Sequence, residues 1–154
     1  MMQKDGVNDI LKIESTTVIN RPVEEVFSVL SNLENSPKWS SAFLEVKKTS
    51  QGPIGVGTTW RAVQKAFGQR LESEVEVTEY EPNRKWTQKG KSPFPVQIQT
   101  TFESVDGGTR VKLRFEGEPG GFFKLAEPLV ATMAKRNIEG DLANLKDLME
   151  GHAL

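Results

Sequence analysis

The chain contains no cysteine and only one histidine among its 154 residues. Without cysteine there is no disulfide, no thiolate metal ligand and no cysteine nucleophile. The single histidine, His152, is third from the end, so histidine-based triads and histidine-rich metal sites are not expected. We therefore expect no cofactor and no metal site, and the lack of cysteine fits a reducing, cytoplasmic location.

The chain also has no excess of positive or negative charge and no long apolar run. Lys and Arg number 20 against 21 Asp and Glu, which gives a net charge of −1 and no general attraction to nucleic acid. No apolar stretch approaches the ~20 residues that span a bilayer, and residues 1–9 lack the apolar centre of a signal peptide. We expect a soluble protein with no nucleic-acid partner and no stable membrane insertion; its oligomeric state is left open.

The length of 154 residues fits one domain, and no repeat, linker or low-complexity block divides it. We expect a flexible N-terminus over residues 1–9, a single domain over residues 10–150 and a short tail over residues 151–154.

Two proline-opened helices are predicted near the start of the domain. Pro22 fits the first turn of the first helix, with Asn20 or Arg21 as its cap, and Pro37 opens a second short helix that carries Trp39. The first helix has one apolar face, with the i, i+3, i+4, i+7 spacing of Val23, Val26, Phe27 and Leu30.

Seven segments have the β-branched and alternating character of strands, and short turns between most of them favour an antiparallel meander. The turn Asp106-Gly107-Gly108 is the strongest hairpin signal. The predicted strands cover residues 12–20, 43–48, 58–67, 70–80, 85–89, 96–104 and 109–116.

A long helix is predicted at the end of the chain. Apolar residues recur at helical spacing from Leu125 to Met149, and Pro128 either kinks this helix or starts its regular part. Gly140 lies inside the helix, where a close approach to another backbone or chance would explain it.

Alternation along the strands assigns their faces, because unpaired charges must stay in water. This rule turns Lys65 and Tyr80 outward, while Glu79 and Arg84 share the inward phase and are expected to form an ion pair that closes a turn. The inward face then holds Trp60, Ala62, Gln64, Leu71, Ser73, Val75, Val77, Trp86, Gln88, Val96, Ile98, Thr100, Phe102, Val111, Leu113 and Phe115.

Several neutral polar side chains occur among these inward residues, as in ligand pockets with apolar walls. The alternative is that each of them pairs with a neighbour or with a buried water. Trp39 and Trp86 could alternatively be core residues that line no pocket. The candidate ligand-binding residues are Trp39, Trp60, Gln64, Ser73, Val75, Trp86, Gln88, Ile98, Thr100, Phe102, Phe122, Leu129, Met133 and Asn137.

Phe122 and Phe123 follow two glycines just before the final helix. Three interpretations stay open for them: a hinged aromatic gate at the cavity mouth, an apolar staple of the helix start, and a patch that touches membranes.

Four segments resemble the START-like, or SRPBCC, superfamily, and within it the polyketide cyclase/dehydrase and lipid-transport family. They are V-I-N-R-P-V-E-E-V-F-S-V-L-S-N-L-E-N-S-P-K-W, I-G-V-G-T-T-W, V-T-E-Y-E-P-N-R-K-W and D-L-A-N-L-K-D-L-M-E. The resemblance implies an α+β helix-grip fold: a seven-stranded curved antiparallel sheet wrapped around a long C-terminal helix, with two short helices after the first strand. It also implies an apolar cavity between sheet and helix.

Members of this superfamily bind lipids, sterols, polyketides or plant hormones, and some catalyse cyclisation or dehydration. Our leading interpretation is the binding or transport of a small hydrophobic ligand in the cavity, without catalytic residues. A polyketide cyclase or dehydratase is the first alternative, for which Glu45 and Asp141 are the remaining ionisable candidates. The second alternative is a protein-interaction module like the superfamily's co-chaperones, which would need a large exposed apolar patch.

Overall fold

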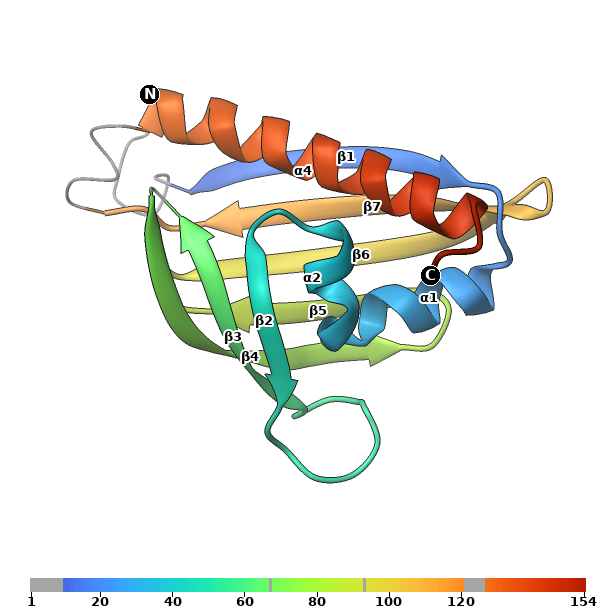
Figure 1. Cartoon of the computed structure of the whole chain (residues 1–154), viewed down its shortest axis with the longest axis horizontal. Coiled ribbons are helices and arrows are strands. Elements are labelled where there is room, and N and C mark those ends of the chain that lie inside the picture. The colour runs from blue at the N-terminus through green and yellow to red at the C-terminus, as the bar shows by residue number, and fades with distance from the viewer. Residues whose placement is uncertain (1–9, 67, 93, 121–126) are drawn as a thin grey trace.

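The computed structural model describes residues 10–66, 68–92, 94–120 and 127–154. Three short helices follow the first strand, and five further strands lead to a seventh strand that pairs with the first. A long helix ends the chain (Figure 1). The elements are β1 (Leu11–Ile19), α1 (Val23–Ser31), η2 (Leu33–Asn35), α2 (Ser36–Trp39), β2 (Phe43–Lys48), β3 (Thr59–Ala66), β4 (Gln69–Glu81), β5 (Lys85–Gly90), β6 (Val96–Val105), β7 (Gly108–Gly117) and α4 (Glu127–Glu150).

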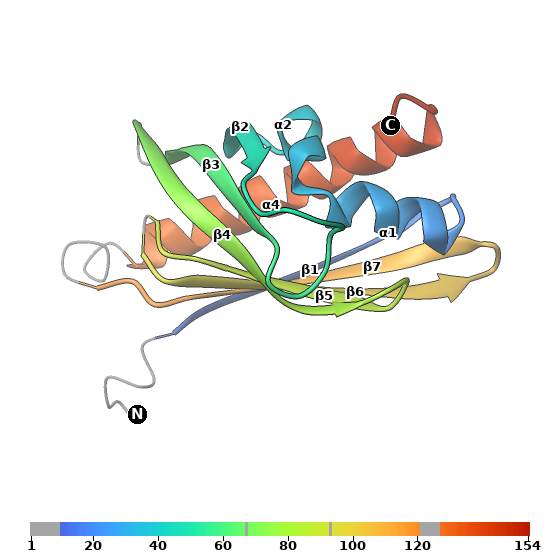
Figure 2. The same ribbon diagram turned by 90° about the horizontal axis from the view of Figure 1, so that it is seen from below.

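All seven strands form one antiparallel sheet in the order β1-β7-β6-β5-β4-β3-β2. Six strands follow each other as a meander, and β1 pairs with β7 from Leu11 opposite Gly117 to Ile19 opposite Thr109. Figure 2 shows the sheet bending around the helices, which all lie on its concave side. The predicted seven-stranded helix-grip fold is confirmed.

The turn between β6 and β7 follows the hairpin signal in the sequence. Asp106 and Gly107 both have positive φ, 48° and 82°, as the commonest two-residue hairpin turn requires. Gly108 follows them, and a Cβ atom at this position would lie only 2.8 Å from the carbonyl oxygen of Ile19. The glycine therefore allows the start of β7 to approach the end of β1.

A β-bulge reverses the alternation of faces near the end of β4. The register with β5 shifts between Val77 and Glu79. Tyr80 consequently turns inward, against the prediction, and its ring lies 5.3 Å from that of Phe27. Glu79 turns outward, where its carboxylate accepts a hydrogen bond from Thr87 Oγ1 at 2.6 Å. One extra residue in a strand exchanges the two faces for everything beyond it.

The ion pair predicted between Glu79 and Arg84 does not form, because the bulge turns Glu79 to the other face. Glu79 Oε2 instead lies 3.3 Å from Lys85 Nζ, and Arg84 pairs with Glu81 at 3.9 Å. The hydrogen bonds from Thr87 and Gln99, together with Lys85, lower the pKa of the Glu79 carboxyl below its usual value. Glu79 is thus a carboxylate on the convex face and takes no part in the concave one.

Helix α1 buries the apolar face that its spacing predicts, with Val26, Phe27 and Leu30 in the core. Its cap differs from the prediction. Pro22 is itself the N-cap residue, with φ −60° and ψ 147°, and the helix begins at Val23. The fixed φ of proline suits this extended cap as well as the first helical turn.

The main core lies between the sheet, α1 and the C-terminal half of α4. Helix α4 contributes Leu142, Leu145 and Met149, all buried. Pro128 is the second residue of α4, so it starts the regular helix. No atom outside the helix lies within 4 Å of a Cβ built on Gly140, so a close backbone approach does not explain this glycine.

The last four residues fold back on the end of α4. The N–H groups of Gly151 and Ala153 donate to the carbonyl oxygens of Asp147 and Leu148, at 3.0 and 2.8 Å, and Leu154 packs against the core. Over the described part of the chain, no helix has the length and apolar character needed to cross a membrane.

Candidate ligand-binding site

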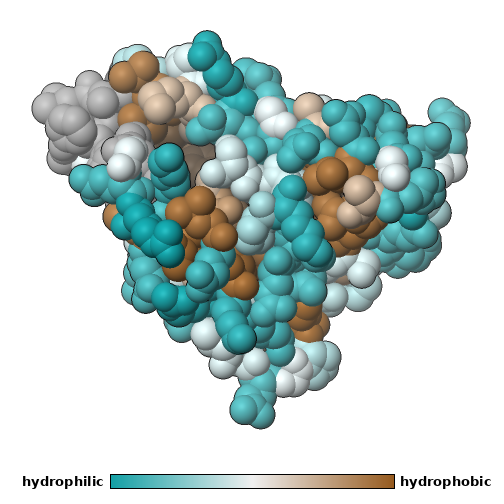
Figure 3. Space-filling model, viewed as in Figure 1, coloured by the Kyte–Doolittle hydropathy of each residue, from teal (hydrophilic) through white to brown (hydrophobic). Residues whose placement is uncertain are grey.

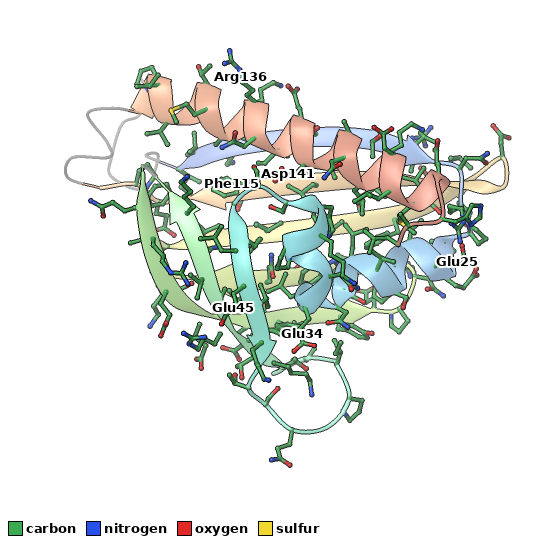
Figure 4. All side chains as sticks on the ribbon, viewed as in Figure 1. Glu25, Glu34, Glu45, Phe115, Arg136 and Asp141 are labelled. Carbon is green, nitrogen blue, oxygen red and sulfur yellow. The ribbon has the colours of Figure 1, made fainter. Side chains whose placement is uncertain are left out.

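A cavity of about 240 Å³ lies between the concave face of the sheet and the N-terminal half of α4. Strands β1, β3, β5, β6 and β7 form its floor, and helices α2 and α4 form its sides. Leu30 of α1, Leu33 of η2 and Phe43 of β2 also contribute to the wall. Phe115 of β7 lies beneath α4 (Figure 4) and belongs to the wall. The cavity exists because the sheet bends away from this half of the helix.

Eight of the predicted ligand-binding residues come together on the cavity wall. Five of them are on strands, one is on α2 and two are on α4. They are Gln64, Trp86, Gln88, Ile98, Thr100, Trp39, Met133 and Asn137. The alternation of the strands and the spacing of α4 were the signals that identified them.

Five other predicted residues lie away from this wall. Trp60, Val75 and Phe102 are buried in the main core, nearer α1, where neighbouring side chains fill the space. Ser73 is half-buried on β4, and Leu129 is 63% exposed on the outer side of α4. Phe122 and Phe123, with the predicted gate, lie outside the described residues.

The wall also contains residues that the sequence did not single out. Leu11, Phe94, Val130 and Ala134 add apolar surface. Ile138 does so too, and it was among the apolar residues found at helical spacing in the last helix. The same spacing would have found Val130 and Ala134, whereas Phe94 lies outside any strand and carries no such signal. The apolar lining is therefore broader than predicted.

Two ionisable side chains lie on the wall, Lys65 and Asp141. Lys65 was predicted to face outward; it is exposed, and its backbone N–H donates to the carbonyl oxygen of Ala42 at 2.9 Å, at the end of β3. This position at the strand end places its long side chain at the cavity rim.

Asp141 connects α4 to the chain segment after α2. Its carboxylate accepts hydrogen bonds from Ser40 Oγ at 2.8 Å, Ser41 N at 3.0 Å and Ser41 Oγ at 3.1 Å. Asn144 Nδ2 adds a bond to the carbonyl oxygen of Trp39 at 3.2 Å. Figure 4 shows Asp141 on the side of α4 that faces α2 and Arg136 on the outer side. The Asp141 carboxylate thus holds the chain segment after α2 against α4 through three hydrogen bonds.

An outer groove adjoins the cavity at this junction. It has a volume of about 460 Å³ and shares Trp39, Ser40, Asn137 and Asp141 with the cavity wall. These four residues therefore form a thin partition between the cavity and the outside.

Buried polar atoms without a partner are concentrated on the cavity wall. Among the described residues, six buried side-chain nitrogen or oxygen atoms make no hydrogen bond. Four belong to wall residues: Trp39 Nε1, Gln64 Oε1, Trp86 Nε1 and Gln88 Oε1. Each such atom costs about 1–3 kcal/mol unless something fills its hydrogen-bonding capacity. Within the same described ranges, no three His, Asp or Glu side chains group as metal ligands would.

The surface around the cavity is apolar at the beginning of α4. Figure 3 shows apolar surface over the first turns of this helix. Leu129 and Met133 are the exposed large apolar residues there, at 63% and 44%. The other exposed large apolar residues of the described chain are spread over the start of the domain, β1, β2 and the loop after β2; they are Ile10, Val18, Leu44 and Val56.

Solved structures share this architecture. A protein from Thermus thermophilus superposes with a TM-score of 0.73 at 20% identity, covering 88% of this chain and 94% of its own. A START superfamily protein from Mycobacterium smegmatis gives 0.66 at 15% identity, covering 92% and 95%. The di-domain ARO/CYC StfQ from the steffimycin biosynthetic pathway gives 0.74 at 14%, covering 94% of this chain and 52% of its own.

At such low identities these similarities establish the fold. A comparison with curated protein sequences gave no match. The sequence model of one family matches residues 11–150, nearly the whole domain. The fold, the cavity and this match agree, and the chain belongs to the polyketide cyclase/dehydrase and lipid transport family.

Proposed function

We propose that this protein binds and carries a small hydrophobic ligand in the cavity beneath α4. The observation that carries the proposal is an unfilled space of about 240 Å³ with a mainly apolar wall. Pockets for small ligands have this composition, with a few polar groups that fix the orientation of the ligand. The family's description as lipid transport supports the same function.

A cyclase-type reaction is the second candidate, favoured by the ARO/CYC protein among the similar structures. Proton transfer in the cavity would need an acid or base with a free position beside the ligand. Asp141 and Lys65 are the ionisable wall residues, but three hydrogen bonds occupy the Asp141 carboxylate and Lys65 lies at the rim. The wall is therefore better suited to holding a ligand than to moving its protons.

A cavity-filling variant tests the proposal. Ala134 lies on the wall, so Ala134→Phe should occupy the space and abolish displacement of a hydrophobic dye by apolar probes. Ala143→Phe, on the exposed side of the same helix, is the matched control and should leave binding intact. Native mass spectrometry of the purified protein should show a bound small molecule that Ala134→Phe loses. Equal binding by both variants, or no probe binding by the unmodified protein, would refute ligand binding in this cavity.

A further inference from the structure

The four polar atoms without a partner on the cavity wall come from two places in the fold, and we treat them as two pairs. Trp86 Nε1 and Gln88 Oε1 form one pair on β5, and Trp39 Nε1 and Gln64 Oε1 form the other at the α2 side. Each pair combines an indole N–H donor with an amide group, and none of the four atoms has a partner within the described structure. Both pairs thus have unused capacity to donate and to accept.

The first pair suits one hydroxyl group. Trp86 and Gln88 are two apart on one strand, so they point to the same face, with Cα atoms about 7 Å apart. Both side chains are more than nine-tenths buried. The cross-strand neighbours of Gln88 are Val77 and Ile98, which offer no polar side-chain atom. Trp86 lies opposite Tyr80 and Thr100, but neither hydroxyl bonds its Nε1. The cavity is therefore the place from which a partner for both atoms could come.

The second pair repeats this arrangement near the start of β2. The cross-strand neighbours of Gln64 are Phe43 and Leu71, again without polar side-chain atoms. Trp39 precedes β2 by a few residues, and the Lys65–Ala42 backbone bond keeps this segment next to β3. A hydroxyl between an indole N–H and an amide accepts from the first and donates to the second. It serves either orientation of the amide, because it is both donor and acceptor.

Size and charge narrow the ligand further. A volume of about 240 Å³ is below the roughly 300–1,000 Å³ that pockets for drug-sized ligands span, so a long acyl chain does not fit inside. The Asp141 carboxylate is already hydrogen-bonded, and Lys65 is at the rim, so no buried wall group offers a free charge to an ionised ligand.

Resting on the proposed ligand-binding function, we infer that the ligand is a compact, uncharged ring compound with a hydroxyl group at each of two separate ends. One hydroxyl lies between Trp86 and Gln88, and the other lies between Trp39 and Gln64. These four side chains select for hydroxyls, while the apolar wall accepts the ring system.

A matched series of probes tests the inference by dye displacement. The probes are naphthalene, a naphthol and a naphthalenediol with hydroxyls at opposite ends, with decanoate as the acyl-chain comparison. Affinity should rise roughly tenfold with each hydroxyl, since each adds a hydrogen bond to buried polar atoms that have no partner. Decanoate should bind more weakly than the diol.

Two isosteric variants connect the selectivity to the residues. In Gln88→Leu the diol should bind only as tightly as the naphthol, whereas naphthalene should bind as before. In Gln64→Leu, too, the diol should bind only as tightly as the naphthol, because the second hydroxyl loses its partner. With two variants, the test still works if one of them does not fold. Neither change should lower the melting temperature of the free protein, because each removes an unpaired buried polar atom. Trp60→Phe is the control: it removes an unpaired N–H away from the wall and should leave the series unchanged.

The outcomes separate this inference from the proposed function. If naphthalene or decanoate binds as tightly as the diol, buried water fills the polar atoms and the hydroxyl inference is wrong, while ligand binding stands. The inference is also wrong if Trp60→Phe alters the series as much as Gln88→Leu does. If no probe binds to the unmodified protein, both the inference and the proposed function fail.

Discussion

The two halves of helix α4 have the same apolar periodicity but opposite surroundings. In residues 141–150, Leu145 and Met149 are fully buried, and side-chain bonds connect the helix to its neighbours at several points. In residues 127–140, Val130 is buried, but Leu129 and Met133 are exposed. The side-chain bonds described there, Thr132 to Pro128 and Lys135 to Glu139, stay within the helix.

The two halves of α4 thus have different surroundings: the C-terminal half packs into the core, and the N-terminal half borders the cavity. The C-terminal half is attached to β1 and to the segment that follows β1. Arg21 Nη1 donates to the carbonyl oxygen of Met149 at 2.5 Å, and Lys146 Nζ donates to that of Val18 at 2.6 Å. The N-terminal half covers the cavity and has few attachments. If the cavity binds a ligand as proposed, the tightly packed part of the helix lies at the end away from it.

The largest effect is expected from core truncation in the C-terminal half. Leu145→Ala should lower the free energy of unfolding by about 3 kcal/mol, because it leaves a hole in a filled core. Met133→Ala is the matching change in the other half. It should lower the free energy of unfolding by less than about 0.5 kcal/mol, because the Met133 side chain is partly in water and borders the empty cavity. Urea unfolding measures both. Similar losses for the two variants would show that the halves are packed alike.

A smaller effect is expected at Asp141, where the C-terminal half of α4 begins and contacts the segment after α2. Asp141→Ala leaves Ser40 Oγ, Ser41 Oγ and Ser41 N without their acceptor, so stability should fall by about 1–2 kcal/mol. The partition between cavity and outer groove should also loosen, which stopped-flow mixing would detect as faster probe association. Asp147→Ala, exposed on the same helix, is the control and should change neither quantity. A slower association in Asp141→Ala would contradict a partition at this place.

Gly140 lies where the two halves meet, and replacing it should stabilise the protein. A Cβ at this position meets nothing within 4 Å, so Gly140→Ala gains helix propensity without a clash. The expected increase in the free energy of unfolding is about 0.5–1 kcal/mol. Thermal unfolding with and without a bound probe would show whether the gain is the same in both states. A loss of stability would mean that a close neighbour exists at this position.

The smallest effect is expected at the last turn of α4 and depends on pH. The Lys146 ammonium and the N–H of Asn20 bond to the Glu150 carboxylate and lower its pKa in the folded protein. The contribution of this carboxylate to stability is therefore present above its ordinary pKa, near 4.3, and is lost as the pH falls through the lowered value. Glu150→Gln should flatten the acid side of the profile of melting temperature against pH. Glu139→Gln, in the other half, is the comparison, and an equal flattening there would exclude a specific role for Glu150.

Much of the fold could be predicted because most of its strands alternate regularly between apolar and polar residues and its turns carry their own signals. The inward orientation of Gln64, Trp86 and Gln88 followed from the two-residue alternation of side chains along a strand. The bulge before Glu79 could not be foreseen, because it results from pairing with β5 and leaves no mark in the residue types. It reversed the predicted face of Tyr80, the only tyrosine in the chain.

The candidate site was less predictable than the fold for a related reason. Trp60 and Trp86 are both inward-facing, yet one is enclosed in the core and the other borders the cavity. Leu129 and Leu145 have the same helical periodicity but opposite exposure. Periodicity tells which way a side chain points. It does not tell how far away the opposite layer lies, since this depends on the bend of the whole sheet.

The pairing of the first strand with the last has a consequence for how the protein forms during translation. Glu14 and Arg114 bond across β1 and β7 although 100 residues separate them in the chain. At roughly 5–20 residues per second, a ribosome needs about 5–20 s to make that intervening stretch. Throughout that interval the nascent β1 has no partner, and its hydrogen-bonding edge is open to other chains. The sheet can therefore close through β1 only after β7 has been made.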